Sequence, residues 1–226
     1  MKNKPVYDCF IKGVGAGIIL SLAGIASLIA GTIPINATLA LFIKSCVFPI
    51  GLIAIVFSNY SLYTSAVATL GAPFDFTNWY FYKLISVWFG NLIGSVIGGS
   101  FIFLGTYTKY KAAIEAVVIA KCSINPLIII GLGVACNFLI CLGVTTAKQF
   151  KTDTSKIAIL FISVFLFMIC GFEHSIANMF YFVYGVFNRI DVSIGSMIVD
   201  NLIPVTIGNF IGGKLFTMLD NQIKSE

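Results

Sequence analysis

Long apolar stretches alternate along the chain with short polar or turn-rich connections. A helix needs about 20 apolar residues to cross the hydrocarbon core of a bilayer, which is roughly 30 Å thick. Six stretches meet this requirement, at approximately 10–31, 39–57, 78–105, 125–147, 156–187 and 199–217. The pattern therefore predicts an all-α integral membrane protein with six transmembrane helices.

Polar residues interrupt the predicted second and fifth spans. The apolar run Leu39–Phe57 is followed by SNYSLYTSAVATL (58–70), which is polar at first and then apolar again. In the fifth span, GFEHSIANM (171–179) places Glu173 and His174 between two apolar runs. Irregular backbone at membrane depth persists only where protein or a water-filled cavity satisfies its polar groups. Breaks in the middle span of each group of three predict an inverted 3+3 repeat, the architecture of many channels and transporters.

The composition agrees with a membrane protein. The chain is 58% hydrophobic and 10% charged, with a mean hydropathy of +0.99, whereas soluble domains carry about 25% charged residues. The first apolar stretch is longer than the apolar region of a removable signal peptide, which has roughly 7–15 residues. We therefore expect a retained first helix, with a signal anchor as the alternative, and one transmembrane domain over residues 1–226 with short terminal ends.

Basic residues lie at the ends of the predicted spans, so the net charge of +5 does not indicate a nucleic-acid partner. With the amino terminus in the cytoplasm, the opposite side would hold Lys109, Lys111, Lys121 and Arg189. The positive-inside tendency then predicts a multi-pass protein of the plasma or inner membrane with both termini cytoplasmic. The cytoplasmic side would hold Lys2, Lys4, Lys12, Lys83, Lys148, Lys151, Lys156, Lys214 and Lys224.

Small residues recur at four-residue spacing in three of the predicted spans. Such faces let helices approach closely in lipid, where van der Waals packing drives association. We therefore expect a tightly packed bundle and contacts between protomers. The three faces are Gly13, Gly17 and Ser21, then Gly90, Gly94 and Gly98, and finally Gly208 and Gly212.

The six cysteines are scattered through apolar segments, with neither a C-x-x-C pair nor a Cys/His ligand cluster. Metal sites and redox dithiols need such groupings. We expect the cysteines to be packing residues, and we expect neither a metal nor a cofactor.

His174 is the single histidine of the chain. One interpretation is a structural histidine that hydrogen-bonds within a packed bundle. Ionisable groups in membrane spans are rare and costly, however, and they are functional candidates by default. An imidazole titrates near neutral pH, which suits proton exchange with a weak acid. The neighbouring Glu173 points elsewhere on a helix, and we expect it, with Asn178, to support the broken backbone, near the positive end of the second half-helix.

The motifs GFEHSIANMF (171–180) and DNLIPVTIGNFIGG (200–213) resemble the signature segments of the formate/nitrite transporter family. NFLICLGV (137–144) and LYTS (62–65) resemble its other two markers, in the expected order, and the resemblance covers nearly the whole chain. It implies an aquaporin-like protomer with broken second and fifth helices, assembled as a homopentamer with one pore per protomer. It also implies that the substrates are small monovalent anions of weak acids, such as formate, nitrite, hydrosulfide, lactate or acetate.

The resemblance assigns roles to individual residues. His174 corresponds to the central histidine of the family, and Thr64 to the polar residue of the loop after the second helix. Lys121 corresponds to a vestibule lysine that would attract anions, with a lysine snorkelling at a helix end as the alternative. The remaining matches are the pore asparagines, Asn137 and Asn209, and the side chains of two hydrophobic constrictions, Leu52 and Leu62 on one side and Phe48, Ile140 and Phe167 on the other. Without the resemblance, these apolar side chains would be assigned to packing.

The chain departs from the family around the loop that would gate the cytoplasmic side. Tyr63 stands where many relatives have phenylalanine, and residues 59–61 replace a segment that is often small or acidic. The stretch 69–79 is also short for the family.

These observations predict a channel or secondary transporter for formate, nitrite or hydrosulfide, linked to protons and not an enzyme. A bare anion cannot cross a ring of Phe and Leu side chains because its desolvation is too costly, whereas a neutral weak acid can. The proton would come from His174 or from water. Two alternatives remain: a channel for neutral solutes such as water or ammonia, and an intramembrane enzyme using His174, for which no G-x-S-x-G motif is present.

Overall fold

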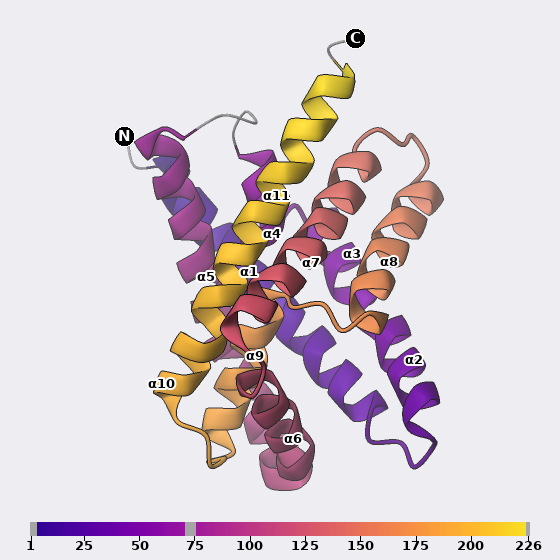
Figure 1. The fold of residues 1–226 in the computed structure, drawn as a ribbon, viewed down its shortest axis with the longest axis vertical. Coiled ribbons are helices and arrows are strands. Elements are labelled where there is room, and N and C mark those ends of the chain that lie inside the picture. The colour runs from indigo at the N-terminus through magenta and orange to yellow at the C-terminus, as the bar shows by residue number, and fades with distance from the viewer. Residues whose placement is uncertain (1–3, 71–75, 225–226) are drawn as a thin grey trace.

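The structure, a computed structural model, describes residues 4–70 and 76–224, and these residues are helical apart from turns and short connections (Figure 1). Residues 71–75, part of the segment where gating was expected to differ from the family, lie outside the described residues. The elements are α1 (Lys4–Ala30), α2 (Ala37–Val47), α3 (Pro49–Phe57), α4 (Tyr63–Thr69), α5 (Asn78–Thr106), the 3-10 helix η1 (Tyr107–Tyr110), α6 (Lys111–Cys122), α7 (Pro126–Ala147), α8 (Asp153–Ile169), α9 (Ser175–Phe187), α10 (Ile194–Ser196), the π-helix η2 (Met197–Leu202) and α11 (Ile203–Lys224).

The helices follow the predicted spans. Among the described residues, five helical segments have at least 18 residues and the apolar character needed to cross a membrane. The fifth predicted span is not one of them, because its break divides it into α8, with 17 residues, and α9, with 13. The protein is therefore a multi-pass, all-helical membrane protein whose fifth span is interrupted.

Two features differ from the sequence-based expectation. The second span is broken twice, since α2 ends at Val47 and α3 starts at Pro49, whose ring lacks the N–H that would continue the first helix. Residues 107–122, expected to be a connection, form η1 and α6.

The first and third spans pack together, as do the fourth and sixth. Helix α1 lies along α5, and α7 lies along α11. The predicted small-residue faces form these contacts: a Cβ added to Gly94 would lie 2.2 Å from the Val14 carbonyl oxygen, and one added to Gly212 would lie 2.2 Å from that of Val134. Equivalent helices of the two halves therefore meet in the same way, as an inverted 3+3 repeat requires.

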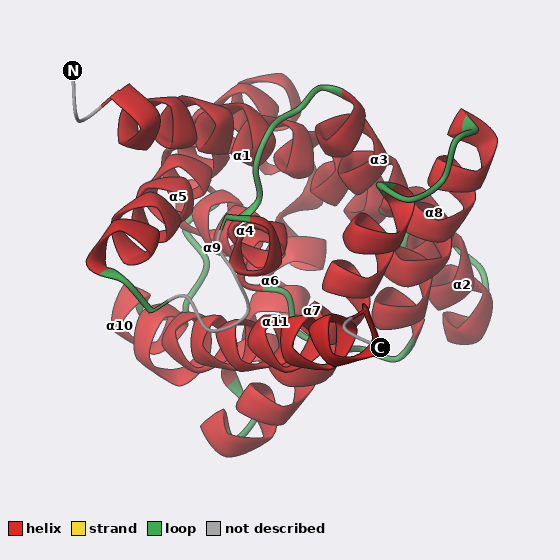
Figure 2. Cartoon of the chain, turned by 90° about the horizontal axis from the view of Figure 1, so that it is seen from above, coloured by secondary structure: helices red, strands yellow, loops and turns green. Residues whose placement is uncertain are grey.

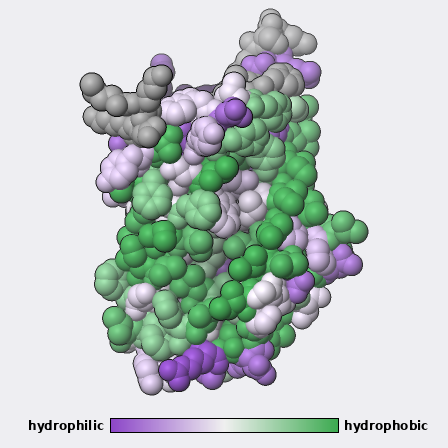
Figure 3. Space-filling view, turned by 90° about the vertical axis from the view of Figure 1, so that its left-hand side faces the viewer, coloured by the Kyte–Doolittle hydropathy of each residue, from purple (hydrophilic) through white to green (hydrophobic). Residues whose placement is uncertain are grey.

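The start of α1 and the end of α11 lie at one end of the bundle, and α6 and α10 lie at the other (Figure 1). Seen from the end that carries the termini, α4 and α9 lie in the middle of the ring formed by the longer helices (Figure 2). A broad apolar belt covers the side of the molecule between more polar ends (Figure 3). The fold thus places two half-helices at the centre of a body whose outside suits lipid.

Candidate functional site

The break in the fifth span depends on Gly171. Helix α8 ends at Ile169, and Gly171 takes a φ of 68°, a left-handed conformation that glycine adopts without the steric cost of a Cβ. The turn is closed by the N–H of Phe172, which donates to the Phe167 carbonyl at 2.9 Å. The chain then restarts as α9, so that residues 170–174 lie at the level where the polar centre forms.

His174 caps the new helix. Its Nδ1 accepts a hydrogen bond of 3.2 Å from the backbone N–H of Ala177, which satisfies one of the free donors at the start of α9. A backbone N–H can only donate, so Nδ1 carries no proton, and the proton of a neutral imidazole sits on Nε2. The cap of α9 is therefore His174, whereas the Glu173 carboxylate contacts Lys121 and Asn178.

Thr64 lies in the first turn of α4 rather than in a loop, and its hydroxyl contacts His174. Its Oγ1 lies 3.1 Å from His174 Nε2, although 110 residues separate the two in the chain. Both residues are buried, with exposed fractions of 0% and 3%. With Nε2 as the donor, Oγ1 is the acceptor, and the threonine hydroxyl proton is left to donate to a group in the centre of the protein.

Asn209 holds the break in place. Its Oδ1 accepts from the backbone N–H of Ser175 at 2.9 Å. Its Nδ2 donates to the carbonyls of Gly133 at 2.9 Å and Glu173 at 3.0 Å. The contacts with Ser175 and Glu173 satisfy backbone groups that the interruption would otherwise leave unpaired inside the bundle, and the contact with Gly133 ties the break to α7.

Asn137 links the two breaks. Its Nδ2 donates to the carbonyl of Thr64 at 3.1 Å and to that of Asn209 at 2.5 Å. Its Oδ1 is buried without a hydrogen-bond partner among the described residues. The two asparagine amides thus serve mainly the backbone, and a direct place for them in the substrate path stays a prediction.

The second span has its own supporting asparagine, Asn91 of α5, which the sequence reasoning missed. Its Oδ1 accepts from the N–H of Tyr63 at 2.8 Å, at the start of α4. Its Nδ2 donates to the carbonyls of Gly13 and Ser61 at 2.9 and 3.0 Å. The sequence did contain a signal, because GNLIG (90–94) around Asn91 repeats as GNFIG (208–212).

The five residues assigned to constrictions are all buried. Phe48 packs edge-on against Phe167, with ring centroids 6.1 Å apart and planes at 85°. Phe167 in turn stacks on the His174 ring at 5.6 Å and 20°. The burial of Phe48, Leu52, Leu62, Ile140 and Phe167 is compatible with packing as well as with a constriction, so their assignment to a pore stays a prediction.

A cavity of about 390 Å³ reaches the central histidine. Side chains from α1, α2, α6, α8 and α9 line it, at the end of the bundle opposite the termini. We call this cavity the vestibule. Its polar lining includes Lys44, Lys121, Glu173, His174, Asn178 and Tyr181.

Lys121 lines the vestibule as the resemblance implied, but it is paired. Its Nζ lies 2.9 Å from both oxygens of Glu173, and the exposed fractions of the two side chains are 17% and 5%. Asn178 donates to the same carboxylate at 2.6 Å and to Asn201 Oδ1 at 2.6 Å. The ion pair and its amides connect α6 to the break and to α9, and direct support of the broken backbone by these two side chains stays a prediction.

Lys44 is a second lysine of the vestibule, and no role was assigned to it from the sequence. The signal was present, since it stands inside the apolar stretch 39–57, where a charged residue is a functional candidate by default.

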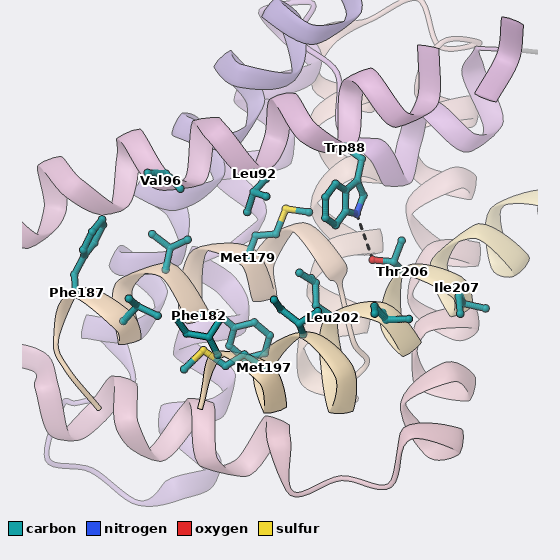
Figure 4. A pocket seen from close by; sticks show the side chains of 15 residues that line it. Trp88, Leu92, Val96, Met179, Phe182, Phe187, Met197, Leu202, Thr206 and Ile207 are labelled. Carbon is teal, nitrogen blue, oxygen red and sulfur yellow. Dashed lines mark hydrogen bonds between the residues drawn. The ribbon is translucent and has the colours of Figure 1, made fainter. Parts of the chain in front are cut away.

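A larger cavity of about 470 Å³ lies on the flank of the protein, between α5, α9, η2 and α11 (Figure 4). We call it the apolar groove. Apolar side chains such as Leu92, Met179 and Phe182 point into it, and the polar contact drawn there is the 3.3 Å hydrogen bond between Trp88 Nε1 and Thr206 Oγ1. Without a charged group in its lining, the groove offers an anion no compensation for lost water.

Two half-helices that meet at a buried polar centre, inside an apolar belt, define a membrane channel or transporter. The chain belongs to the formate/nitrite transporter family, since the model of that family, described as Formate/nitrite transporter, matches residues 1–221. The protein is thus a membrane anion channel or transporter of this family.

Relatives with curated names agree with this assignment. A Formate-nitrite transporter of Entamoeba histolytica is 32% identical over 222 residues; the match covers 92% of this chain, but the chain spans only 62% of that protein. The Formate channel FocA of Haemophilus influenzae is 28% identical, over 94% of this chain and 85% of its own length. The FocA of Escherichia coli K12 is 29% identical, over 96% and 86%.

Solved structures share the fold. A structure described as a pentameric formate channel with formate bound superposes with a TM-score of 0.89 at 26% identity, over 100% of this chain and 99% of the other. An FNT family ion channel gives the same TM-score at 23% identity, over 100% and 92%, which is a likeness of fold alone.

Proposed function

We propose that each protomer passes small monovalent anions of weak acids, of the formate, nitrite and hydrosulfide class, through its own pore, together with a proton. The protein would assemble as a homopentamer in the plasma or inner membrane, with both termini cytoplasmic and the vestibule outside. It would be a transporter or channel and not an enzyme.

The arrangement of the vestibule and the His174–Thr64 pair carries this proposal. Cationic side chains line the vestibule, which ends at a neutral hydrogen-bonding pair with the apolar Phe167 beside it. Positive charge raises the local concentration of anions. An apolar passage then admits the neutral acid far more readily than the anion, because burying an uncompensated charge is costly.

The hydrogen bonds at His174 favour water as the source of the proton. A proton on Nδ1 would break the hydrogen bond from Ala177 and place a charge in a buried site. The neutral ring instead donates from Nε2 to Thr64, which orients the threonine hydroxyl as a donor to the substrate. The pair would thus stabilise the anion before protonation, while vestibule water supplies the proton.

The assembly proposal rests on the structural relative and on the flank of the protein. The relative with formate bound is described as pentameric and aligns over the full length of this chain. The apolar groove and the exposed apolar side chains of α11 give this flank a surface for neighbouring protomers or lipid.

Uptake into liposomes tests the function. Purified protein in proteoliposomes should take up radiolabelled formate, nitrite and hydrosulfide above the rate of empty liposomes, and faster with an inward proton gradient. Water or ammonia flux without anion flux would instead favour a neutral-solute channel. Cross-linking in the membrane should yield species up to the pentamer, and a ladder ending at another number would refute that state.

A further inference from the structure

We propose that Lys44, rather than Lys121, is the cation that recruits the substrate anion into the vestibule. This assignment deepens the proposed function, on which it rests. It concerns a residue of the second span that lies between the outer end of the protein and the central pair.

Among the described charged side chains that line the vestibule, Lys44 carries the positive charge that no carboxylate compensates. Lys121 faces both oxygens of Glu173 at 2.9 Å, so these two charges compensate each other. In the described part of the chain, the other ion pair joins Lys156 to Asp153, and neither pair involves Lys44. The net positive charge of the cavity therefore comes from Lys44.

The two lysines also differ in the hydrogen-bond donors that their ammonium groups can offer to an anion. The Lys121 ammonium already donates hydrogen bonds to the Glu173 carboxylate, to which Asn178 also donates. An anion approaching Lys121 would meet the negative charge of that carboxylate. The Lys44 ammonium has no hydrogen-bond acceptor among the described side chains, and it offers up to three donors to an incoming anion.

The backbone of Lys44 is fixed beside the cavity. Ser27 Oγ of α1 donates to the Lys44 carbonyl at 3.0 Å, and the Phe48 N–H donates to the same oxygen at 3.2 Å. The Lys44 stem runs past the end of α1, where its Cδ would lie 3.6 Å from a Cβ on Gly31. The side chain is thus half-buried along the cavity wall rather than extended freely into solvent.

Lys44 also stands one helical turn before Phe48. That ring packs on Phe167, which stacks on His174. An anion held at Lys44 would therefore wait close to the apolar passage and the central pair.

Initial rates of formate uptake into proteoliposomes test this assignment. For Lys44→Gln we expect the half-saturation concentration to rise roughly tenfold, the lower end of electrostatic focusing by a charged cleft, with a near-normal maximal rate. Lys44→Arg should stay close to the wild type. Lys109→Gln, which removes an exposed lysine at the same end outside the vestibule, is the matched control and should change nothing.

The salt dependence of the half-saturation concentration separates an electrostatic role of Lys44 from a merely structural one. The wild-type half-saturation concentration should rise with ionic strength and approach that of Lys44→Gln near 1 M salt, where the Debye length is about 3 Å. If Lys44→Gln does not assemble, Lys44→Met replaces it, with the same expectation. If the wild type takes up formate and Lys44→Gln has the same half-saturation concentration and the same salt dependence, the role of Lys44 is overturned while the proposed function stands. Absence of uptake of every anion by the wild type would overturn the proposed function and this assignment with it.

Discussion

Asn91 and Asn209 make the same set of hydrogen bonds in the two halves of the protein. Each Oδ1 accepts from the first N–H of a half-helix, that of Tyr63 in α4 or Ser175 in α9. Each Nδ2 donates to the carbonyl two residues before that half-helix and to a glycine carbonyl of the neighbouring long helix. In each half, one asparagine amide thus supplies hydrogen-bond partners to the interrupted backbone. The inverted 3+3 repeat therefore includes these hydrogen bonds as well as the order of the helices.

Removal of either amide should destabilise the protein to a similar extent. In Asn91→Ala and Asn209→Ala, buried backbone groups lose their partners, at about 1–3 kcal/mol for each group left unpaired. We expect a clearly lower midpoint of thermal unfolding in detergent for both variants. Asn221→Ala, at an exposed position near the end of α11, is the control and should leave the midpoint unchanged. A large loss for one amide and none for the other would contradict the equivalence of the two halves.

The spans could be predicted from the lengths of apolar runs, and His174 and Thr64 stood out through motifs that resemble the family, but their contact across 110 residues follows only from the fold. The partner of Lys121 could not, since Glu173 lies 52 residues away and only the fold brings them together. Lys44 was missed for a related reason: hydropathy shows that a segment enters the membrane but not which cavity its charge faces. Helix α6 was missed because it is short and carries Lys111, Glu115 and Lys121 among its apolar residues, so that its sequence resembles a polar connection.

The Lys121–Glu173 pair should behave as a structural unit. Lys121→Met leaves a buried carboxylate without its cation, and loss of one partner of a buried pair costs about 3–5 kcal/mol. Glu173→Gln should be milder, because the amide keeps hydrogen-bonding capacity at Asn178. The double variant Lys121→Met/Glu173→Gln should recover part of the stability lost in Lys121→Met, as measured by thermal unfolding in detergent.

Formate uptake by the same double variant separates the two lysines. If Lys44 supplies the net charge of the vestibule, the folded double variant should keep a half-saturation concentration near that of the wild type. A rise as large as that expected for Lys44→Gln would show instead that Lys121 attracts the anion despite its partner.

Close backbone contact between the paired long helices should make two glycines intolerant of a methyl group. A Cβ at Gly94 would lie 2.2 Å from the Val14 carbonyl oxygen, and one at Gly212 would lie 2.2 Å from that of Val134. Because backbone must move to relieve these clashes, Gly94→Ala and Gly212→Ala should each cost at least about 1–3 kcal/mol. Gly131→Ala, where an added Cβ meets nothing within 4 Å, should keep the wild-type unfolding midpoint or raise it slightly, because alanine is the better helix former.

The pH dependence of uptake should distinguish the two possible sources of the proton. His174→Asn keeps a side chain that can cap α9 and donate a hydrogen bond toward Thr64, but it has no group that titrates near neutral pH. With water as the proton source, we expect slower uptake that still rises as the external pH falls. At pH values above the pKa of a carboxylic acid, which is about 4, each unit of fall in pH raises the protonated fraction about tenfold. His174→Phe, which loses both the cap and the donor, should be slower still. Uptake by His174→Asn that no longer responds to pH, in vesicles where the wild type does, would identify the imidazole as the proton donor.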